Sequence, residues 1–325
     1  MSGFSLGPVR AQALDDACII AVSNFLAAIM IPSAFVLPAL RRSALALVAL
    51  CAVSNPAWSG SPITILFVGN SFTYGDARVK DFKPDTVTDL NGSEIGGVPA
   101  LFKAMTVQAG LNYEVSLETE PGAGLDFHYE KKFATIVKPW DVVLLQSHSM
   151  LDGAAPGAHD KLIRYSGLLA RAFQARNPNV DVRLTSTWSR ADQTYLSGGA
   201  WYGKPIYQMA LDVRRGYDAA AAASPAIRSV IPVGEAWNRA ITAGVADANP
   251  YDGIEWGQIN LWGRDHYHGS THGYYLAALT IFGQVTGRDP RLLGADNAIG
   301  RAIGIETRTA RVLQEIAAAQ LARKE

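Results

Sequence analysis

A serine near the start of the chain and an Asp-His pair near its end are residue types that could do chemistry together. Ser71 follows Gly69 and Asn70, while Asp265 and His268 lie three residues apart far downstream. A serine hydroxyl becomes a nucleophile when a base removes its proton, and histidine, with an ordinary pKa near ~6.5, suits that role. A carboxylate on the other ring nitrogen orients the base. These residues predict attack by Ser71, with His268 as base and Asp265 orienting it.

Two plainer interpretations remain open. Gly, Asn and Ser are common turn residues, so residues 69–71 could be an ordinary exit from a strand. The histidines could form a polar loop or assist hydrolysis through a metal held by His148, His266 and His272. No cysteine or closely spaced acidic triplet completes a recognisable metal pattern. We therefore predict neither a metal nor a cofactor.

The segment before Ser71 has the character of a buried parallel strand. Residues 63–69 form an apolar and β-branched run that stops at Gly69, as in strands covered on both faces. Gly69 permits a tight turn there. Ser71 is thus expected just beyond the carboxyl edge of a sheet, where open α/β sheets bind ligands.

Strand and helix patterns alternate along the rest of the domain. Further strands are expected at residues 113–119, 141–146, 180–187 and 229–234, and a long loop at 76–97. Helices are expected at 98–109, 126–137, 159–175, 207–223, from 234 through 243, at 273–283 and at 298–322. Such alternation predicts a parallel sheet with helices on both faces, an α/β fold of three α/β/α layers.

The run Gly69-Asn70-Ser71-Phe72 and the distant Asp265-x-x-His268 resemble the first and last signature blocks of the SGNH (GDSL-type) hydrolase family. The resemblance covers residues 63 to about 290, and these two outer blocks are its specific part. It implies a flavodoxin-like sandwich and a serine esterase. The triad would consist of Ser71, His268 and Asp265.

The second block of that family is matched more faintly by residues 121–125. The resemblance implies that a glycine here donates its backbone N–H to the oxyanion, together with the N–H of Ser71. Gly122 is the expected donor, with Gly124 as the alternative.

The third block departs from the family pattern. The strand at 141–146 runs into Gln146-Ser147-His148, where the family has Gly-x-Asn-Asp. Alignment by strand position places His148 at the asparagine that holds the oxyanion, with Gln146 two residues earlier. Either side chain can donate a hydrogen bond, so both are candidate oxyanion donors.

A hydrophobic leader at residues 1–59 precedes a hydrolase domain at 60–325. Two basic residues, Arg41 and Arg42, stand before an apolar run that ends in small residues near Ser59. This arrangement is typical of a secretory signal peptide, and it predicts export to the periplasm or the outside of the cell. Met30 is an alternative start.

A membrane anchor is the alternative to cleavage. Residues 18–39 are almost wholly apolar and long enough to span a bilayer, although Pro32 and Pro38 would strain such a helix. The membrane would then be met only through the uncleaved leader.

Composition narrows the partners. The chain carries 29 basic and 29 acidic residues, so no strong field would steer it to nucleic acid. Its only cysteines, Cys18 and Cys51, lie in the leader, which removes disulfides and thiol nucleophiles from the domain. A small-molecule or glycan ester is the expected partner.

Four residues are candidates for substrate binding: Asn70, Trp188, Arg190 and Trp262. Indole faces can stack on sugar rings or line an acyl pocket. Arg190, like Arg264 beside Asp265, could bind an anionic group. Loop packing and solvated surface charge are the plainer alternatives.

These observations predict an exported serine esterase that removes an acyl group, most plausibly from a carbohydrate, through an acyl-enzyme. A lipase or thioesterase of the same chemistry is the near alternative. A non-catalytic glycan-binding protein on the same scaffold is the alternative from another class, motivated by the changed third block.

Overall fold

The computed structural model describes residues 60–294 and 298–322 of the chain. They belong to one compact unit, Gly60–Glu325. The predicted leader, with its cleavage site, Cys18, Cys51 and the possible membrane anchor, lies outside the described residues. Within the described ranges, no helix combines the length and apolar character needed to cross a membrane.

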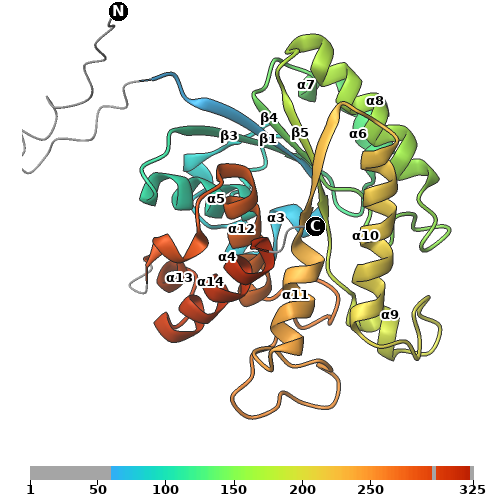
Figure 1. The fold of residues 1–325 in the computed structure, drawn as a ribbon, viewed down its shortest axis with the longest axis vertical. Helices are drawn as coiled ribbons and strands as arrows, with labels where there is room; N and C mark the ends of the chain where they lie inside the picture. Colours follow the sequence, from blue (N-terminus) through green and yellow to red (C-terminus); the bar gives the residue numbers. More distant parts are fainter. Residues whose placement is uncertain (1–59, 295–297, 323–325) are drawn as a thin grey trace, which may run out of the picture. The chain divides into compact units, whose positions relative to one another are not determined.

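A six-stranded sheet with the order β2-β3-β1-β4-β5-β6 forms the centre of the domain (Figure 1). All neighbouring strands are parallel. The strands are β1 (Ile63–Gly69), β2 (Thr88–Asp89), β3 (Tyr113–Thr119), β4 (Val142–Leu145), β5 (Asp181–Ser186) and β6 (Ile227–Pro232). Without the short edge strand β2, this is the flavodoxin-like order, and the chain switches direction between β1 and β4.

Helices cover both faces of this sheet, which confirms the predicted three-layer α/β fold (Figure 1). One face carries α6 (Leu125–Lys131), α8 (Asp160–Arg176) and α10 (Tyr207–Ala222). The other carries α5 (Gly97–Gln108), α11 (Val233–Thr242), α12 (Thr271–Thr286) and α14 (Thr307–Leu321). The shorter elements are α3 (Ser71–Tyr74), α4 (Ala77–Lys80), η2 (Pro84–Thr86), α7 (Phe133–Ile136), α9 (Ala191–Tyr195), η3 (Pro290–Leu293) and α13 (Ala298–Ala302).

Two hydrophobic cores follow from the period of two along β1. Ile65 and Phe67 belong to the core beneath α5 and α12, whereas Leu66 and Val68 belong to the core beneath α6, α8 and α10. Because successive strand side chains face opposite sides, an uninterrupted apolar run serves both cores. The predicted buried strand is confirmed, and both cores fix the position at which it ends.

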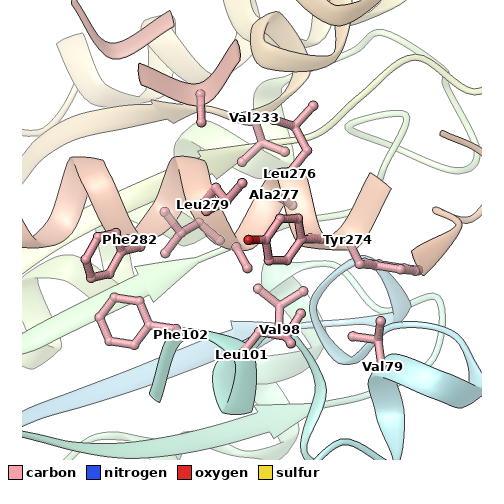
Figure 2. Packing of buried hydrophobic residues seen from close by; sticks show 14 of the residues in the cluster. Val79, Val98, Leu101, Phe102, Val233, Tyr274, Leu276, Ala277, Leu279 and Phe282 are labelled. Carbon is pink, nitrogen blue, oxygen red and sulfur yellow. The ribbon is translucent and has the colours of Figure 1, made fainter. Parts of the chain in front are cut away.

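Helix α12 is buried along most of its length and packs against α5. In Figure 2, Tyr274 and Phe282 of α12 lie toward Val98 and Phe102 of α5, whereas Leu276 lies beside Val233 of α11. Ser270 caps the helix by accepting a hydrogen bond from the N–H of Gly273 (3.3 Å). The loop that precedes α12, which contains Asp265 and His268, is thereby attached to a rigid element.

Several expected elements differ in detail. The helix expected at 126–137 is divided into α6 and α7 at Lys132, where φ is −120°. The helix expected at 298–322 is divided into α13 and α14, and the intervening Gly304 has a φ of +83°. A positive φ cannot continue a right-handed helix.

The long loop expected at 76–97 contains short elements of its own. Helix α4, the 3₁₀ turn η2 and the edge strand β2 lie within it. Helix α9 was likewise not expected. These segments are too short for hydrophobic periodicity to reveal them.

Candidate active site

The turn after β1 holds Ser71 through its neighbour Asn70. The Asn70 side chain accepts a hydrogen bond from the N–H of Phe72 (3.0 Å), which caps helix α3. Its amide nitrogen donates to the carbonyls of Ala123 (2.8 Å) and Ser147 (3.3 Å). Asn70 is buried, and these bonds tie together the loops after β1, β3 and β4. The structure therefore assigns it to the turn and not to substrate binding.

Gln146 supports the same turn from β4. Its Oε1 accepts from the N–H of Asn70 (3.0 Å) and from Thr73 Oγ1 (3.0 Å), and its Nε2 donates to the carbonyl of Ser147. A Cβ at Gly69 would lie 2.3 Å from Thr73 Oγ1 and 2.6 Å from Gln146 Oε1, so only glycine fits there. The prediction of Gln146 as an oxyanion donor is thus corrected, because its amide is buried within the turn.

Asp265 and His268 meet Ser71 across 197 positions of the sequence. His268 Nε2 lies 2.8 Å from Ser71 Oγ, and His268 Nδ1 lies 2.6 Å from Asp265 Oδ2. The other oxygen, Asp265 Oδ1, accepts from the N–H groups of Tyr267 (3.1 Å) and His268 (3.0 Å). The loop thus shapes the pair locally, and Asp265, His268 and Ser71 form one hydrogen-bonded chain.

Helix α12 and the loop after β5 position the two halves of this chain. The Tyr274 hydroxyl donates to the carbonyl of Ser71 (2.9 Å). The N–H groups of Ala191 and Asp192 donate to the carbonyl of His266 (3.1 and 3.3 Å). His266 has a φ of +55°, an uncommon value for a residue with a side chain. Both contacts restrain the distance between nucleophile and base.

The local electrostatics keep Asp265 ionised. Burial raises the pKa of Asp265, but hydrogen bonds from the His268 ring and from the N–H groups of His268 and Tyr267 outweigh it, so its pKa is lowered. Its side chain is 49% exposed and that of His268 is 28% exposed, whereas Ser71 is 6% exposed. A carboxylate on Nδ1 leaves Nε2 able to accept the proton of the Ser71 hydroxyl.

Among the described residues, the backbone N–H groups of Ser71 and of both candidate glycines, Gly122 and Gly124, have no acceptor. Gly122 has a φ of +68° and is exposed on the loop that Asn70 holds. N–H groups of this kind can stabilise an oxyanion. The N–H of Gly122 is therefore free to donate, and its role as the second donor stays a prediction.

No protein-family model matches the sequence, and no curated protein matches it significantly. Solved structures do match. A DUF4886 family protein from Bacteroides uniformis has a TM-score of 0.57 at 19% identity, covering 80% of this chain and 95% of its own. A protein assigned as a GDSL-like lipase from Parabacteroides merdae has a TM-score of 0.49 at 16% identity, and the match covers 70% of this chain and 96% of the other. A variant of an acetylxylan esterase from Geobacillus stearothermophilus has a TM-score of 0.41 at 16% identity, and the match covers 76% of this chain and 97% of the esterase.

The chain shares the fold of the DUF4886 family protein. The predicted fold class, an α/β sandwich around a parallel sheet, is therefore confirmed. At this identity the similarity concerns the fold, and the chemistry of the domain has to be argued from its own residues.

His148 follows β4 in the chain. It is half-buried and, together with Gly122, lines a cavity of about 260 Å³. Burial and the positive charge of Arg190 lower the pKa of His148, so the ring is neutral. Its Nδ1 accepts from the N–H of Met150 (3.3 Å), which leaves the proton on Nε2 as a possible donor. The changed third block thus supplies a neutral imidazole.

The two tryptophans predicted to bind substrate are core residues. Trp188 and Trp262 are each 1% exposed. Trp188 stacks between Phe72 (ring centroids 4.4 Å apart) and Trp237 (4.4 Å, parallel within 1°). Trp262 donates its indole N–H to the carbonyl of Ser189 (2.8 Å). Since Phe72 follows the nucleophile, the stack supports the site from within, and the substrate-binding role of both residues is corrected.

Arg190 is also committed inside the protein. It forms a two-pronged ion pair with Asp192 (3.0 and 2.6 Å), and its guanidinium lies 3.7 Å from the centroid of the Tyr267 ring. The Tyr267 ring lies 3.9 Å from that of His268. Arg190 thus buttresses the base through Tyr267, and its charge is already paired, which argues against the expected contact with an anionic substrate.

The histidines considered as metal ligands do not lie together. Among the described residues, no three His, Cys, Asp or Glu side chains form a group that could hold a metal ion. His266 packs against the ring of Tyr251 (4.3 Å), while His148 lines the cavity beside Gly122. His148, His266 and His272 are therefore not brought together.

A second, more open cavity of about 500 Å³ contains the nucleophile and the base. It is lined by Ser71, Tyr74, Gly75, Asp76, Gly263, Arg264, Asp265, His268 and Gly269. Sequence reasoning missed Tyr74 and Asp76. The available indication was their spacing, three and five residues after Ser71 in the turn that leaves the sheet edge.

Proposed function

We propose that this protein is a serine hydrolase that cleaves esters through Ser71, His268 and Asp265. The observation that carries the proposal is the continuous chain of short contacts from Asp265 Oδ2 through the His268 ring to Ser71 Oγ. Nucleophile, base and orienting carboxylate in this order are the arrangement needed to activate a serine.

The reaction follows from this geometry. His268 Nε2 takes the proton of Ser71 as Oγ bonds to the ester carbon, and the carbonyl oxygen becomes an oxyanion beside the N–H groups of Ser71 and Gly122. His268 then gives that proton to the departing alcohol, which leaves an acyl-enzyme. A water molecule, deprotonated by the same nitrogen, releases the acid and restores Ser71.

An acyl group on a carbohydrate is the substrate class that we favour. The cavity at Ser71 is open, and the residues that line it are polar, charged or aromatic, together with three glycines. A lipase or a long-chain thioesterase would need an apolar channel for its acyl chain. The enclosed apolar cavity between Phe67, Phe72 and Trp188 has only about 20 Å³, room for about one water molecule and not for an acyl chain.

The proposal is tested with Ser71→Ala and p-nitrophenyl acetate. The variant should lose roughly 10⁴- to 10⁶-fold in kcat, with an unchanged thermal unfolding midpoint. Ser197→Ala, at an exposed serine outside both cavities, is the matched control and should keep full activity. Turnover by Ser71→Ala at the wild-type rate would remove Ser71 from the mechanism.

A non-catalytic glycan-binding protein is the second candidate, favoured by the altered residues after β4. A fluorophosphonate probe separates the two candidates, because an unactivated serine does not react with it. Labelling of the wild type but not of Ser71→Ala supports the hydrolase. Absence of labelling, together with binding of glycans, supports the alternative.

We also propose that the protein is exported after cleavage of its leader. The support is the basic and apolar pattern before Ser59. N-terminal sequencing of protein recovered from the periplasm or medium should find Gly60 first. Full-length protein in the membrane fraction would instead indicate an uncleaved anchor.

A further inference from the structure

The position of His268 decides on which side of Ser71 the alcohol of an ester must lie. When the bond between the carbonyl carbon and the alcohol oxygen breaks, the proton on His268 Nε2 passes to that oxygen. The oxygen must therefore lie within hydrogen-bond reach of Nε2, about 2.6–3.2 Å. The alcohol must occupy space that borders the His268 ring.

Only one of the two cavities described above borders that ring. The 500 Å³ cavity is lined by Ser71 and His268 together. The 260 Å³ cavity, at Gly122 and His148, is lined by neither. The larger cavity is therefore the one that can receive the leaving alcohol.

The wall of the larger cavity is suited to a polar ligand. None of its nine lining residues has an aliphatic side chain, and three are glycines. Tyr74 is half-buried, and burial raises its pKa, so the phenol keeps its proton as a donor. Asp76 Oδ1 is buried without a partner. The Tyr74 phenol can exchange hydrogen bonds with the hydroxyls of a ligand.

The charges in this wall disfavour an anionic alcohol. Arg264 is exposed and forms no ion pair with any described residue, so its guanidinium can donate to a ligand. Two carboxylates, Asp76 and Asp265, lie in the same wall. A phosphate or carboxylate on the alcohol would face both of them for one Arg264 contact.

Deepening the function proposed above, on which this inference rests, we propose that the 500 Å³ cavity is the alcohol subsite and that it takes an uncharged, polyhydroxylated alcohol such as a sugar unit. Arg264 and Tyr74 are its specificity-determining residues. Arg264 donates to hydroxyl oxygens at the rim, and Tyr74 contributes its hydroxyl close to Ser71. The alcohol departs into this cavity with the proton from His268.

The test compares three acetate esters of increasing alcohol complexity: ethyl acetate, a monoacetylated methyl glucoside and the corresponding methyl glucuronoside. The wild type should prefer the glucoside ester over both others in kcat/KM. Arg264→Ala should lower the ratio of kcat/KM for glucoside over ethyl ester roughly tenfold, mainly by raising KM for the sugar ester, as expected for hydrogen bonds to a charged donor. Tyr74→Phe should lower the same ratio by a smaller factor of about three.

Lys161→Ala is the matched control, because Lys161 lines the smaller cavity and is paired with Asp152 (3.0 Å). It should leave the ratio unchanged. A ratio that responds to Lys161→Ala and not to Arg264→Ala would place the alcohol in the other cavity and overturn the inference. Preference for the glucuronoside would overturn the assignment of an uncharged ligand.

Failure of the underlying function has a different outcome. If the wild type hydrolyses none of the three esters, or if Ser71→Ala hydrolyses them all at the wild-type rate, both proposals fall. If Ser71→Ala is inactive while Arg264→Ala and Tyr74→Phe keep the wild-type ratio, only the alcohol subsite falls.

Discussion

Two carboxylate–histidine pairs with similar geometry occur in this domain, Asp265–His268 and Glu118–His128. In each pair the carboxylate contacts Nδ1, at 2.6 Å in the first and 2.5 Å in the second. The first pair is partly exposed at the cavity of Ser71. The second joins the end of β3 to α6, and both of its side chains are fully buried.

The two pairs differ in what the second ring nitrogen, Nε2, of the histidine contacts. His268 Nε2 contacts Ser71 Oγ, whereas His128 Nε2 is buried with no hydrogen-bond partner among the described residues. Glu118 also accepts from Asn91 Nδ2 (3.2 Å). A carboxylate on histidine is therefore not by itself a sign of catalysis. The pair becomes a base when the opposite nitrogen has a nucleophile to deprotonate and a substrate can reach it.

The largest expected effect comes from replacing each histidine by glutamine. His268→Gln should lower kcat by roughly 10⁴- to 10⁶-fold with little change in stability, because the base is lost from a partly exposed loop. His128→Gln should keep kcat within a few-fold but lower the free energy of unfolding, since it weakens a buried hydrogen bond to a charge, by about 1.5–3 kcal/mol. Steady-state kinetics and urea unfolding measure both. Equal loss of turnover in the two variants would contradict the comparison.

A smaller effect, on stability, is expected from removing the charge of Glu118. Burial raises its pKa, but the hydrogen bond and charge of His128, then Asn91 and Lys132, outweigh it, so its pKa lies below the ordinary 4.5. A carboxylate whose pKa is lower in the folded than in the unfolded state stabilises the protein at pH values above the unfolded-state pKa. This stabilisation is lost as the pH falls through the folded-state pKa. Glu118→Gln should therefore cost about 1.5–3 kcal/mol at pH 7, and the difference from wild type should shrink below about pH 4.5.

The matched variant for that experiment is Asp265→Asn. The pKa of Asp265 is also lowered. Its carboxylate is half-exposed, however, and should contribute less than about 1 kcal/mol to stability. Unfolding curves between pH 3 and pH 7 compare the two variants. A pH-independent difference for Glu118→Gln would show that its ionisation does not stabilise the fold.

The smallest effect is expected at Asp76, a carboxylate near the site with no histidine partner. Burial raises its pKa, and the N–H of Val79 and the charge of Arg78 only partly oppose this. Because the pKa of Asp76 is higher in the folded than in the unfolded state, the wild type loses stability as the pH rises from the unfolded-state pKa to the folded-state pKa. Asp76→Asn keeps an oxygen for the Val79 N–H and should raise the thermal midpoint slightly at pH 7, and the gain should vanish in acid. A lower midpoint at pH 7 would indicate a stabilising carboxylate.

The central geometry was predictable because it depends on local patterns. An apolar run ending in glycine predicted where β1 stops, and the switch point of a parallel sheet lies next to that end. Asp265 and His268 are brought together by a turn within four residues, so their spacing alone indicated a pair. Their meeting with Ser71 then required only that the expected fold form.

The surroundings of the site were less predictable because they depend on residues distant in the sequence. Trp188 was a candidate for substrate binding, yet it stacks on Trp237 in the core. Gln146 has the donor group that an oxyanion needs, but Asn70 and Thr73 hold its Oε1, and its Nε2 donates to the carbonyl of Ser147. Arg190 satisfies its charge on Asp192. In each case the residue type allowed the predicted role, and a partner elsewhere in the fold took it.

The short contact between Ser71 and His268 also sets when activity can begin. Its two atoms come from opposite ends of the domain, and the later one is held by α12, which packs against α5. Contacts of such long sequence separation form late and slowly in folding. For the function proposed above, a chain still being synthesised has the serine but not its base, so it should be inert until nearly the whole domain has emerged. Turnover is thus a stringent reporter of completed folding.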